Sequence, residues 1–248
     1  MSLTIYAQRL GDDSLILGQR LSEWCGHAPA IEVDLSLANV ALDLIGQASH
    51  FLGLAGAIEG KGRDADALAF RRDVMDFTNC LLVEQPNGDF AQTIARQFLF
   101  SHYQVLFLER LAAAQDERFA AIAAKALKEV SYHATLASDW VVRLGDGTDE
   151  SKARMIAGLD WMWRFADELF VMDDVDAAAI TAGAGVDKAA LRPAWDQRID
   201  AVLADAGLVR PAARRATLGG RTGRHSEHLG HLLSEMQFLQ RAYPGATW

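Results

Sequence analysis

The chain has 248 residues, of which 50% are hydrophobic and 23% are charged, and its formal net charge is −9. This length fits one large domain or two small ones. The average hydrophobicity and the mixture of charges exclude a disordered chain. Duplex DNA and anionic membranes bind proteins that neutralise their phosphates. The net negative charge therefore predicts no nucleic-acid partner and no membrane partner.

Cysteine usage and the N-terminal segment point to a cytoplasmic protein. Cys25 and Cys80 are too few for a disulfide framework and form no C-x-x-C motif. Residues 1–13 lack the basic region and apolar run of a signal peptide. The longest charge-free stretch near them, residues 44–58, is shorter than the ~18–20 apolar residues that a spanning helix needs.

Apolar residues at helical spacing predict a series of helices. Leu3, Leu10, Leu17 and Trp24 recur every seven residues, which indicates one long helix that ends before Pro29. We expect further helices over about 33–58, 89–112, 119–144, 155–169, 191–206 and 226–243. A short helix is expected within 66–77, a loop over 83–90 and an irregular segment or short helix over 175–191.

The absence of strand signals decides the fold class. No run of alternating β-branched residues, no hairpin turn and no internal repeat occurs. We therefore predict a single all-α domain over residues 1–248, a ferritin-like four-helix bundle with additional helices toward the C-terminus.

Four-helix bundles of this kind often hold two irons with a Glu from each of two helices and a Glu-x-x-His pair from each of the other two. None of the seven histidines here has an acidic residue three positions before it. The residues found there are, in chain order, Trp24, Gln47, Leu99, Val130, Thr222, His225 and His228. This absence predicts that the chain holds no di-iron centre of its own.

Two sets of polar residues stand where such a site would be. The first set lies on the second long helix and consists of Asp43, Gln47 and His50. The second lies on the 119–144 helix and consists of Glu129, Tyr132 and His133. We interpret all six as buried polar residues of a degenerate di-iron site that form hydrogen bonds between helices. Metal ligation and contact with a partner are the alternatives.

Three other patterns carry weaker signals. His225, His228 and His231 follow at steps of three, which would suit a metal on one side of a helix or polar contacts at a helix start. Arginines crowd a loop at positions 210, 214, 215, 221 and 224, where they would bind a phosphate or acidic partner or form scattered ion pairs. Tryptophans at 140, 161, 163 and 195 are predicted to be core or interface anchors.

Several segments resemble the C-subunit family of ring 1,2-phenylacetyl-CoA epoxidase, a multicomponent oxygenase of bacterial phenylacetate degradation. The segments are QRLSEWCGHAPAIEVDLSLANVALDLIGQA, LLVEQPNGDFAQTIARQ, KALKEVSYH, RLGDGTDES and HSEHLGHLLSEMQFLQRAYPGATW. The resemblance implies a ferritin-like fold and a homologous catalytic partner that holds the di-iron centre. It also implies a reductase with flavin and an iron–sulfur cluster, and insertion of one oxygen atom from O2 into the aromatic ring.

From the residues and this resemblance together we predict a non-catalytic, structural subunit that has no catalytic, cofactor-binding or metal-binding residues of its own. We expect a hetero-oligomer, or a homodimer when the chain is alone. Two alternatives stay open. One is an active di-iron oxygenase with the ligands Asp43, His50, Glu129 and His133, and the other is a module that binds CoA esters through Arg214 and Arg215.

Overall fold

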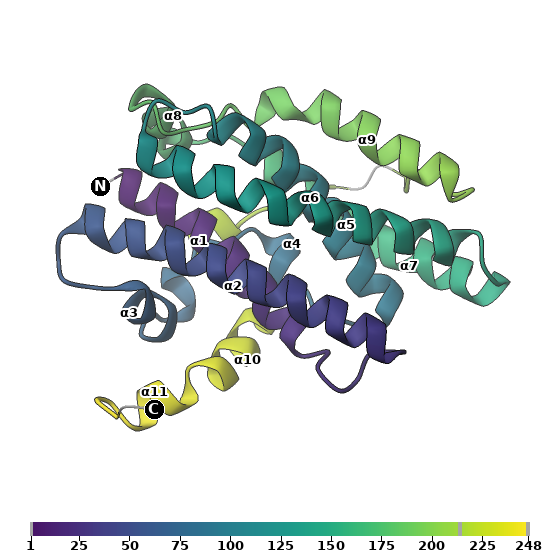
Figure 1. Ribbon diagram of the computed structural model, residues 1–248, viewed down its shortest axis with the longest axis horizontal. Helices are drawn as coiled ribbons and strands as arrows, with labels where there is room; N and C mark the ends of the chain where they lie inside the picture. The colour runs from purple at the N-terminus through teal and green to yellow at the C-terminus, as the bar shows by residue number, and fades with distance from the viewer. Residues whose placement is uncertain (1, 213–214, 247–248) are drawn as a thin grey trace. The chain divides into compact units, whose positions relative to one another are not determined.

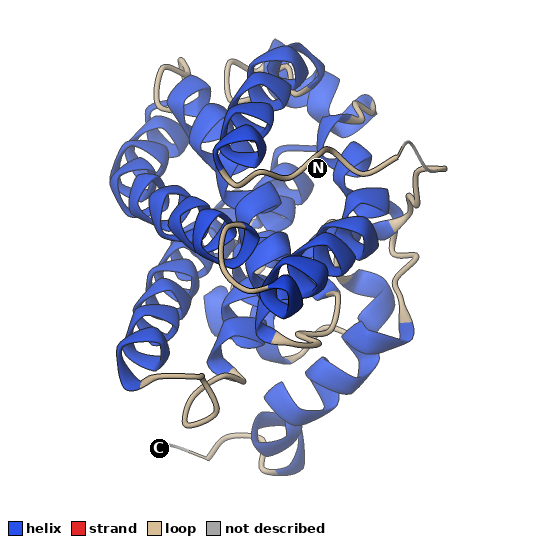
Figure 2. Ribbon diagram, turned by 90° about the vertical axis from the view of Figure 1, so that its right-hand side faces the viewer, coloured by secondary structure: helices blue, strands red, loops and turns tan. Residues whose placement is uncertain are grey.

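The structure is a computed structural model that describes residues 2–212 and 215–246 (Figure 1). Within these ranges the chain forms helices and loops and no strand, which confirms the all-α class (Figure 2). The contacts divide the chain into two compact units, Met1–Gln85 with Gly219–Trp248, and Pro86–Leu218. Each unit is described by itself, and the single-domain expectation stays a prediction.

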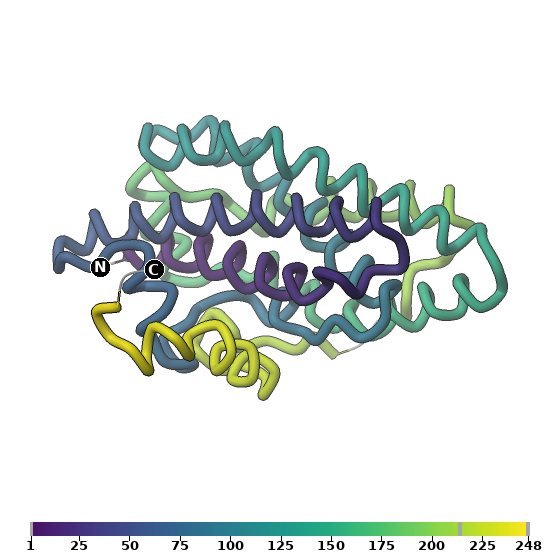
Figure 3. The backbone as a smooth tube through the Cα atoms, turned by 60° about the horizontal axis from the view of Figure 1, so that its bottom comes forward, coloured from purple at the N-terminus to yellow at the C-terminus, as the bar shows by residue number. Residues whose placement is uncertain are grey.

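The first unit is built on a pair of long helices, α1 (Ser2–Ser22) and α2 (Ile31–Glu59), which lie side by side (Figure 3). Two glycines on α1 allow the close approach. A Cβ atom on Gly11 would lie 2.6 Å from the Cγ atom of Leu52, and one on Gly18 would lie 3.1 Å from the Cγ1 atom of Ile45. The close approach to α2 therefore runs along Gly11 and Gly18, one position beyond the predicted heptad residues Leu10 and Leu17.

The turn between α1 and α2 is fixed by polar contacts. Gly26 has φ +78°, a conformation that favours glycine, and its N–H donates to Asp34 Oδ2 at 2.7 Å. His27 Nδ1 lies 3.0 Å from the carbonyl oxygen of Cys25. The first helix ends at Ser22, earlier than the end that Pro29 predicted, and Trp24 lies in the turn instead of on the helix.

Shorter helices complete the first unit. They are α3 (Ala65–Phe70), η1 (Val74–Asp76), α4 (Leu81–Glu84), η4 (Gly220–Thr222), α10 (Glu227–Met236) and α11 (Phe238–Ala242). The short helix expected within 66–77 is thus two pieces, and the start of the expected 83–90 loop is the end of α4. The last helix, expected to reach residue 243 unbroken, is interrupted at Gln237, whose Nε2 donates to the carbonyls of Ala69 at 2.9 Å and Arg72 at 3.0 Å.

The second unit surrounds α5 (Phe90–Leu111), which packs against α6 (Glu117–Gly145), α7 (Asp149–Ala166) and α9 (Arg192–Asp205). Its other elements are η2 (Asp167–Phe170), α8 (Asp174–Thr181) and η3 (Ala189–Leu191). Asp89 caps α5 by accepting from the N–H of Gln92 at 2.9 Å. The Gln92 side chain donates to Pro86 O instead of closing a capping box.

The tryptophan prediction is confirmed most clearly at Trp195. This side chain is fully buried, and its Nε1 donates to Leu99 O at 3.0 Å. Its ring centroid lies 5.8 Å from that of Trp163 and 5.3 Å from that of Phe170. Trp161 is not a core residue, because 39% of it is exposed, with the Arg164 guanidinium over its ring, and its role as an interface anchor stays a prediction.

The four predicted long helices are all present, with α1 and α2 in the first unit and α5 and α6 in the second. Their assembly into a ferritin-like bundle stays a prediction. Among the described residues, α2 is the helix long and apolar enough to cross a membrane by length and composition. A core helix with one buried face passes the same test, so this finding decides nothing by itself.

His102 provides a pH test of the second unit. Its Nε2 lies 2.8 Å from Ser138 Oγ, which joins α5 to α6. Burial and the positive charge of Arg198 lower the pKa of His102 from 6.5 to about 4, so the folded ring is neutral. The neutral His102 ring therefore contributes fully to the unfolding free energy above pH 6.5. This contribution is lost as the pH falls toward the pKa of His102 in the folded protein.

We expect wild type to lose up to about 3 kcal/mol more of its unfolding free energy across this acid range than the variant His102→Gln. Denaturant unfolding at a series of pH values measures the difference. His231→Gln is the control because His231 is exposed. Parallel pH profiles for wild type and His102→Gln would contradict the assignment of a neutral ring.

Candidate functional site

The predicted polar residues lie on two helices of different units. On α2, Gln47 is buried, Asp43 is half-buried and His50 is exposed. On α6, His133 is fully buried, Glu129 is half-buried and Tyr132 is 51% exposed.

The expectation that all six are buried is therefore wrong for His50 and Tyr132. The reason is the helical rotation of about 100° per residue. The step from His133 back to Tyr132 turns the tyrosine away from the buried seam of α6. The step of three from Gln47 leaves His50 beyond the edge of the buried face of α2. Asp43 and Gln47 on α2, and Glu129 and His133 on α6, stay candidates for polar contacts, each pair within its own unit.

The three C-terminal histidines do not form one cluster. His225 precedes α10, which begins at Glu227, so the three do not share a helix face. The His225 ring is buried, while His228 is half-buried and His231 is exposed. Among residues 2–212 and 215–246, no group of three or more His, Cys, Asp or Glu side chains is arranged to hold a metal ion.

The arginine-rich loop is divided between the two units. Arg210 pairs with Asp196 at 2.9 Å and Asp200 at 2.7 Å, and its guanidinium lies over the Trp163 ring. Arg221 belongs to the first unit, where it pairs with Asp13. Arg214 lies outside the described residues. Arg210 and Arg221 thus already serve as partners of carboxylates within the fold.

A buried ionic cluster on α1 was not predicted. Asp12 is fully buried and receives two hydrogen bonds from Arg72, one of them at 3.0 Å from Nη1, and two from Thr78, at 2.9 Å from N and 3.1 Å from Oγ1. Asp13 receives the Cys80 N–H at 2.7 Å and both terminal nitrogens of Arg221 at 3.0 and 2.6 Å. These two neighbouring carboxylates therefore hold two separate loops.

Glu84 is the centre of a second buried network in the same unit. Its Oε1 accepts from the N and Oγ of Ser226 at 2.6 and 2.8 Å, and its Oε2 accepts from Asn79 Nδ2 at 2.8 Å. His225 Nδ1 lies 2.7 Å from the same Oε2. The backbone oxygen of Glu84 accepts from Arg20 Nε and Nη2 at 3.1 and 2.9 Å.

The partners of His225 set its charge. Nδ1 faces the Glu84 carboxylate, and Nε2 faces the carbonyl oxygen of Phe77 at 2.8 Å. Both neighbours are acceptors, so both ring nitrogens donate and the ring is an imidazolium. Burial is the largest single influence and lowers the pKa of His225, but the hydrogen bond and charge of Glu84, the Phe77 carbonyl and the charge of Asp12 together raise it above 6.5.

The sequence did contain signals for these networks. Adjacent aspartates in the middle of an otherwise apolar heptad, Asp12 and Asp13, are unusual because buried charges require partners. Arg221 belonged to the loop cluster that we singled out. Asn79 lies five residues before Glu84, but the other partners of Glu84 and Asp12 named above lie between 60 and 142 residues away in the chain, beyond the reach of spacing arguments.

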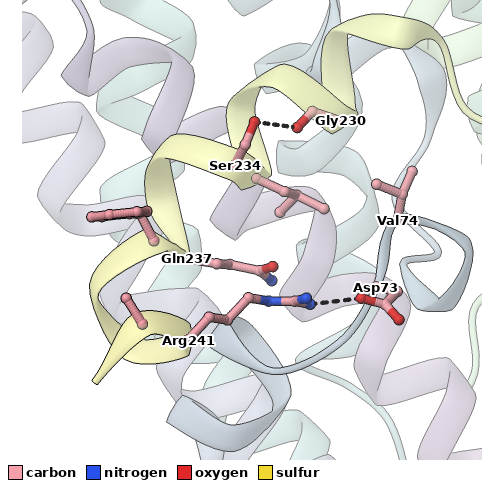
Figure 4. A pocket seen from close by; sticks show the side chains of 9 residues that line it. Asp73, Val74, Gly230, Ser234, Gln237 and Arg241 are labelled. Carbon is pink, nitrogen blue, oxygen red and sulfur yellow. Dashed lines mark hydrogen bonds and ion pairs between the residues drawn. The ribbon is translucent and has the colours of Figure 1, made fainter. Parts of the chain in front are cut away.

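A groove in the first unit has a volume of about 530 Å3. Residues from the 73–74 segment and from α10 and α11 line it (Figure 4). Arg241 Nη2 donates to Asp73 Oδ1 at 2.8 Å, and Ser234 Oγ donates to Gly230 O at 2.9 Å. Gln237, as described above, reaches two backbone carbonyls. These polar groups thus serve the fold and do not form a catalytic constellation.

The chemistry of the two networks is structural. Every carboxylate in them accepts several hydrogen bonds, and the imidazolium of His225 donates both of its protons to buried acceptors. None of these groups is placed to attack a substrate or to move a proton to solvent. These hydrogen bonds and ion pairs hold residues 72–80 and 221–226 against α1 and α4.

Two comparisons with known proteins agree with each other. The chain matches the family model of phenylacetic acid catabolic proteins over residues 1–248. It is similar to the C subunit of 1,2-phenylacetyl-CoA epoxidase from Escherichia coli (strain K12), with 49% identity over 246 residues that cover 99% of this chain and 99% of the relative. The similarity therefore extends through both units.

The Glu84–His225 pair predicts a stability that depends on pH. Because the folded pKa of His225 is raised, its contribution is fully present below pH 6.5 and is lost as the pH rises through the folded pKa. Glu84→Gln should lower the unfolding free energy by about 3–5 kcal/mol on the acid side, since it leaves a buried imidazolium without its counter-charge. The deficit should shrink at alkaline pH.

Denaturant unfolding of Glu84→Gln, His225→Gln and the double variant forms the cycle that isolates the pair. Glu235→Gln is the matched control because Glu235 is an exposed glutamate of the same unit. A deficit for Glu84→Gln that is equal at all pH values would show that the pair is not ionic.

Proposed function

Because the chain belongs to the phenylacetic acid catabolic protein family, we propose that it is the non-catalytic, structural subunit of a 1,2-phenylacetyl-CoA epoxidase in phenylacetate catabolism. The observation that carries this proposal is the near full-length similarity to a protein named as the C subunit of that enzyme. Its partners are then the other subunits, among them a homologous catalytic subunit with the di-iron centre and a reductase with flavin and an iron–sulfur cluster.

The donor set of this chain does not fit a di-iron centre, which supports the non-catalytic role. Gln47 occupies the position three before His50, and a neutral amide is a poor ligand for ferrous iron. On α5, the residue three before His102 is Leu99, and His102 Nε2 is engaged by Ser138. On α6, Glu129 lies four residues before His133 instead of the three that a Glu-x-x-His pair requires. Four carboxylates would be needed to offset two ferrous ions.

The fold supports a structural role in another way. The carboxylates of Asp12, Asp13 and Glu84 accept hydrogen bonds from loop residues. These buried acids therefore stabilise the subunit and leave its outer surfaces for partners. Cys25 and Cys80 are both thiols, which supports a reducing compartment, and we include the cytoplasm in the proposal.

Co-expression tests the proposal directly. We expect the purified chain alone to contain far less than one iron per chain and to show no oxygen-dependent turnover. We expect the catalytic subunit to have a higher thermal midpoint and slower proteolysis with this chain present, since a partner that binds the folded state stabilises it. Elemental analysis, oxygen consumption and thermal unfolding provide the readouts. Stoichiometric iron in the isolated chain would overturn the proposal.

The alternative of an active site in this chain is tested by Asp43→Asn combined with Glu129→Gln. A structural subunit should support turnover by the complex within about twofold of wild type, whereas loss of two of four ligands would reduce turnover about 100-fold or more. Asp139→Asn is the matched control because Asp139 is exposed on α6. Iron content of the complex should also be unchanged by the double substitution.

A further inference from the structure

The loop before α5 contains an Asn-Gly pair, in which Asn87 is half-buried and Gly88 is exposed. The side-chain amide of an asparagine can react with the backbone nitrogen of the next residue. Attack of that nitrogen on the amide carbon closes an imide ring. Glycine hinders this attack least, because it has no side chain beside the nitrogen and its backbone is the most flexible. The pair is therefore a candidate site of covalent self-modification.

The structure leaves the attacking nitrogen available. Gly88 has φ +59°, and a Cβ atom there would lie 2.6 Å from Gln92 Cδ, so the turn requires glycine at this position. Within the part of the chain that the structure describes, the N–H of Gly88 donates no hydrogen bond. Because Gly88 is exposed, hydroxide reaches this N–H from solvent.

The amide that would be attacked is polarised by a buried cation. Asn87 Oδ1 accepts a hydrogen bond from Arg96 Nη2 at 2.6 Å. Arg96 is fully buried, and a guanidinium keeps its charge in proteins. A positive charge at this oxygen stabilises the oxyanion that forms when a nucleophile adds to Cγ, and the low dielectric constant of a buried site strengthens the effect. Arg96 is thus placed as an oxyanion-hole donor toward Asn87.

The other two asparagines of the chain differ in their surroundings. Asn79 is fully buried, and the nitrogen that would attack it belongs to Cys80, whose N–H donates to Asp13 Oδ1 at 2.7 Å. Asn39 is exposed but lies in the middle of α2, where the regular helical backbone and a following valine restrain the attack. Reactivity is therefore expected at Asn87 and not at these two positions.

We propose that Asn87 deamidates through an imide with Gly88 and that the Arg96 guanidinium promotes the reaction. Hydroxide takes the proton of Gly88 N, and the nitrogen forms a bond to Asn87 Cγ. The bond between Cγ and Nδ2 then breaks, and the leaving nitrogen departs as ammonia. Water adds to the imide and opens it to a carboxylate. The sum is asparagine and water giving aspartate or isoaspartate and ammonia, with no change in oxidation state.

Arg96 also favours one of the two products. Attack of water at Cγ restores the normal backbone and gives aspartate, whereas attack at the backbone carbonyl carbon gives isoaspartate. The backbone oxygen of Asn87 accepts from the neutral Thr93 hydroxyl at 2.9 Å. Charge-assisted hydrogen bonds are roughly twice as strong as neutral ones, so the carbon next to the guanidinium is the more activated. Aspartate should therefore exceed isoaspartate in the folded chain.

The product would strengthen the start of α5. Its carboxylate pairs with Arg96 and lies beside the N-terminus of the helix, where negative charge is favourable. The reaction is a slow, irreversible change that replaces a neutral acceptor by an ionic one. The inference goes beyond the proposed function and does not depend on it.

Incubation of the purified chain for weeks at several pH values, followed by peptide mapping, tests the proposal. The tryptic peptide 73–96 contains both Asn79 and Asn87. We expect the mass increase of an amide replaced by a carboxyl at Asn87, while Asn79 and Asn39 stay intact. The rate should rise with pH, because hydroxide removes the Gly88 proton.

The role of the guanidinium is tested by Arg96→Met, which should slow the conversion about 100-fold and raise the share of isoaspartate. Arg118→Met is the matched control, because Arg118 is an exposed arginine of the same unit, and it should leave rate and product ratio unchanged. Circular dichroism establishes that each variant is folded. Wild type unfolded in urea removes the same contact without a substitution, so it should convert more slowly than the folded chain and give more isoaspartate.

An Asn87 that stays intact in the folded wild type overturns the proposal. Conversion that is as fast in urea as in the folded chain, with the same product ratio, also overturns it, because the reaction then owes nothing to Arg96. A folded Arg96→Met variant that converts at the rate of wild type has the same consequence.

Discussion

The first unit depends on three buried carboxylates, Asp12, Asp13 and Glu84, each of which is saturated by donors from distant segments. A buried carboxylate without partners is costly, so each one requires its loop to be in place. Arg72, Arg221 and His225 are in turn cations that need these acids. Helices α1 and α2 could pair through apolar contacts alone. The segments 72–80 and 221–226, in contrast, are positioned by these ion pairs and hydrogen bonds.

The motifs that make the sequence recognisable lie at these fastening points. In VEQPNG, Glu84 binds the His225–Ser226 pair that opens the HSEHLGH segment, while Asn87 accepts a 2.6 Å hydrogen bond from Arg96 at the start of α5. In EWCGHAP, Gly26 is tied to Asp34. The most distinctive residues of the chain therefore maintain its fold, which agrees with a subunit whose contribution is structural.

The sequence predicted what depends on neighbours within a helix and missed what depends on distant partners. Periodicity located α1, α2, α5 and α6, since apolar spacing reports packing directly. It offered His225 as a metal ligand or as a polar contact at a helix start, and it did not identify the partner, Glu84, which is 141 residues away. It also assigned His50 to the interior, since a polar stripe drawn by spacings of three and four drifts around the helix. Burial is set by neighbouring helices, which one helix cannot show.

Glycines on the two sides of the α1–α2 pair have different explanations. Gly11 and Gly18 lie where Leu52 and Ile45 leave no room for a side chain, so packing within the unit requires them. Gly46 and Gly53 have no such neighbour, and glycine inside a helix costs about 0.5–1 kcal/mol relative to alanine. The fold of a single chain does not account for that cost.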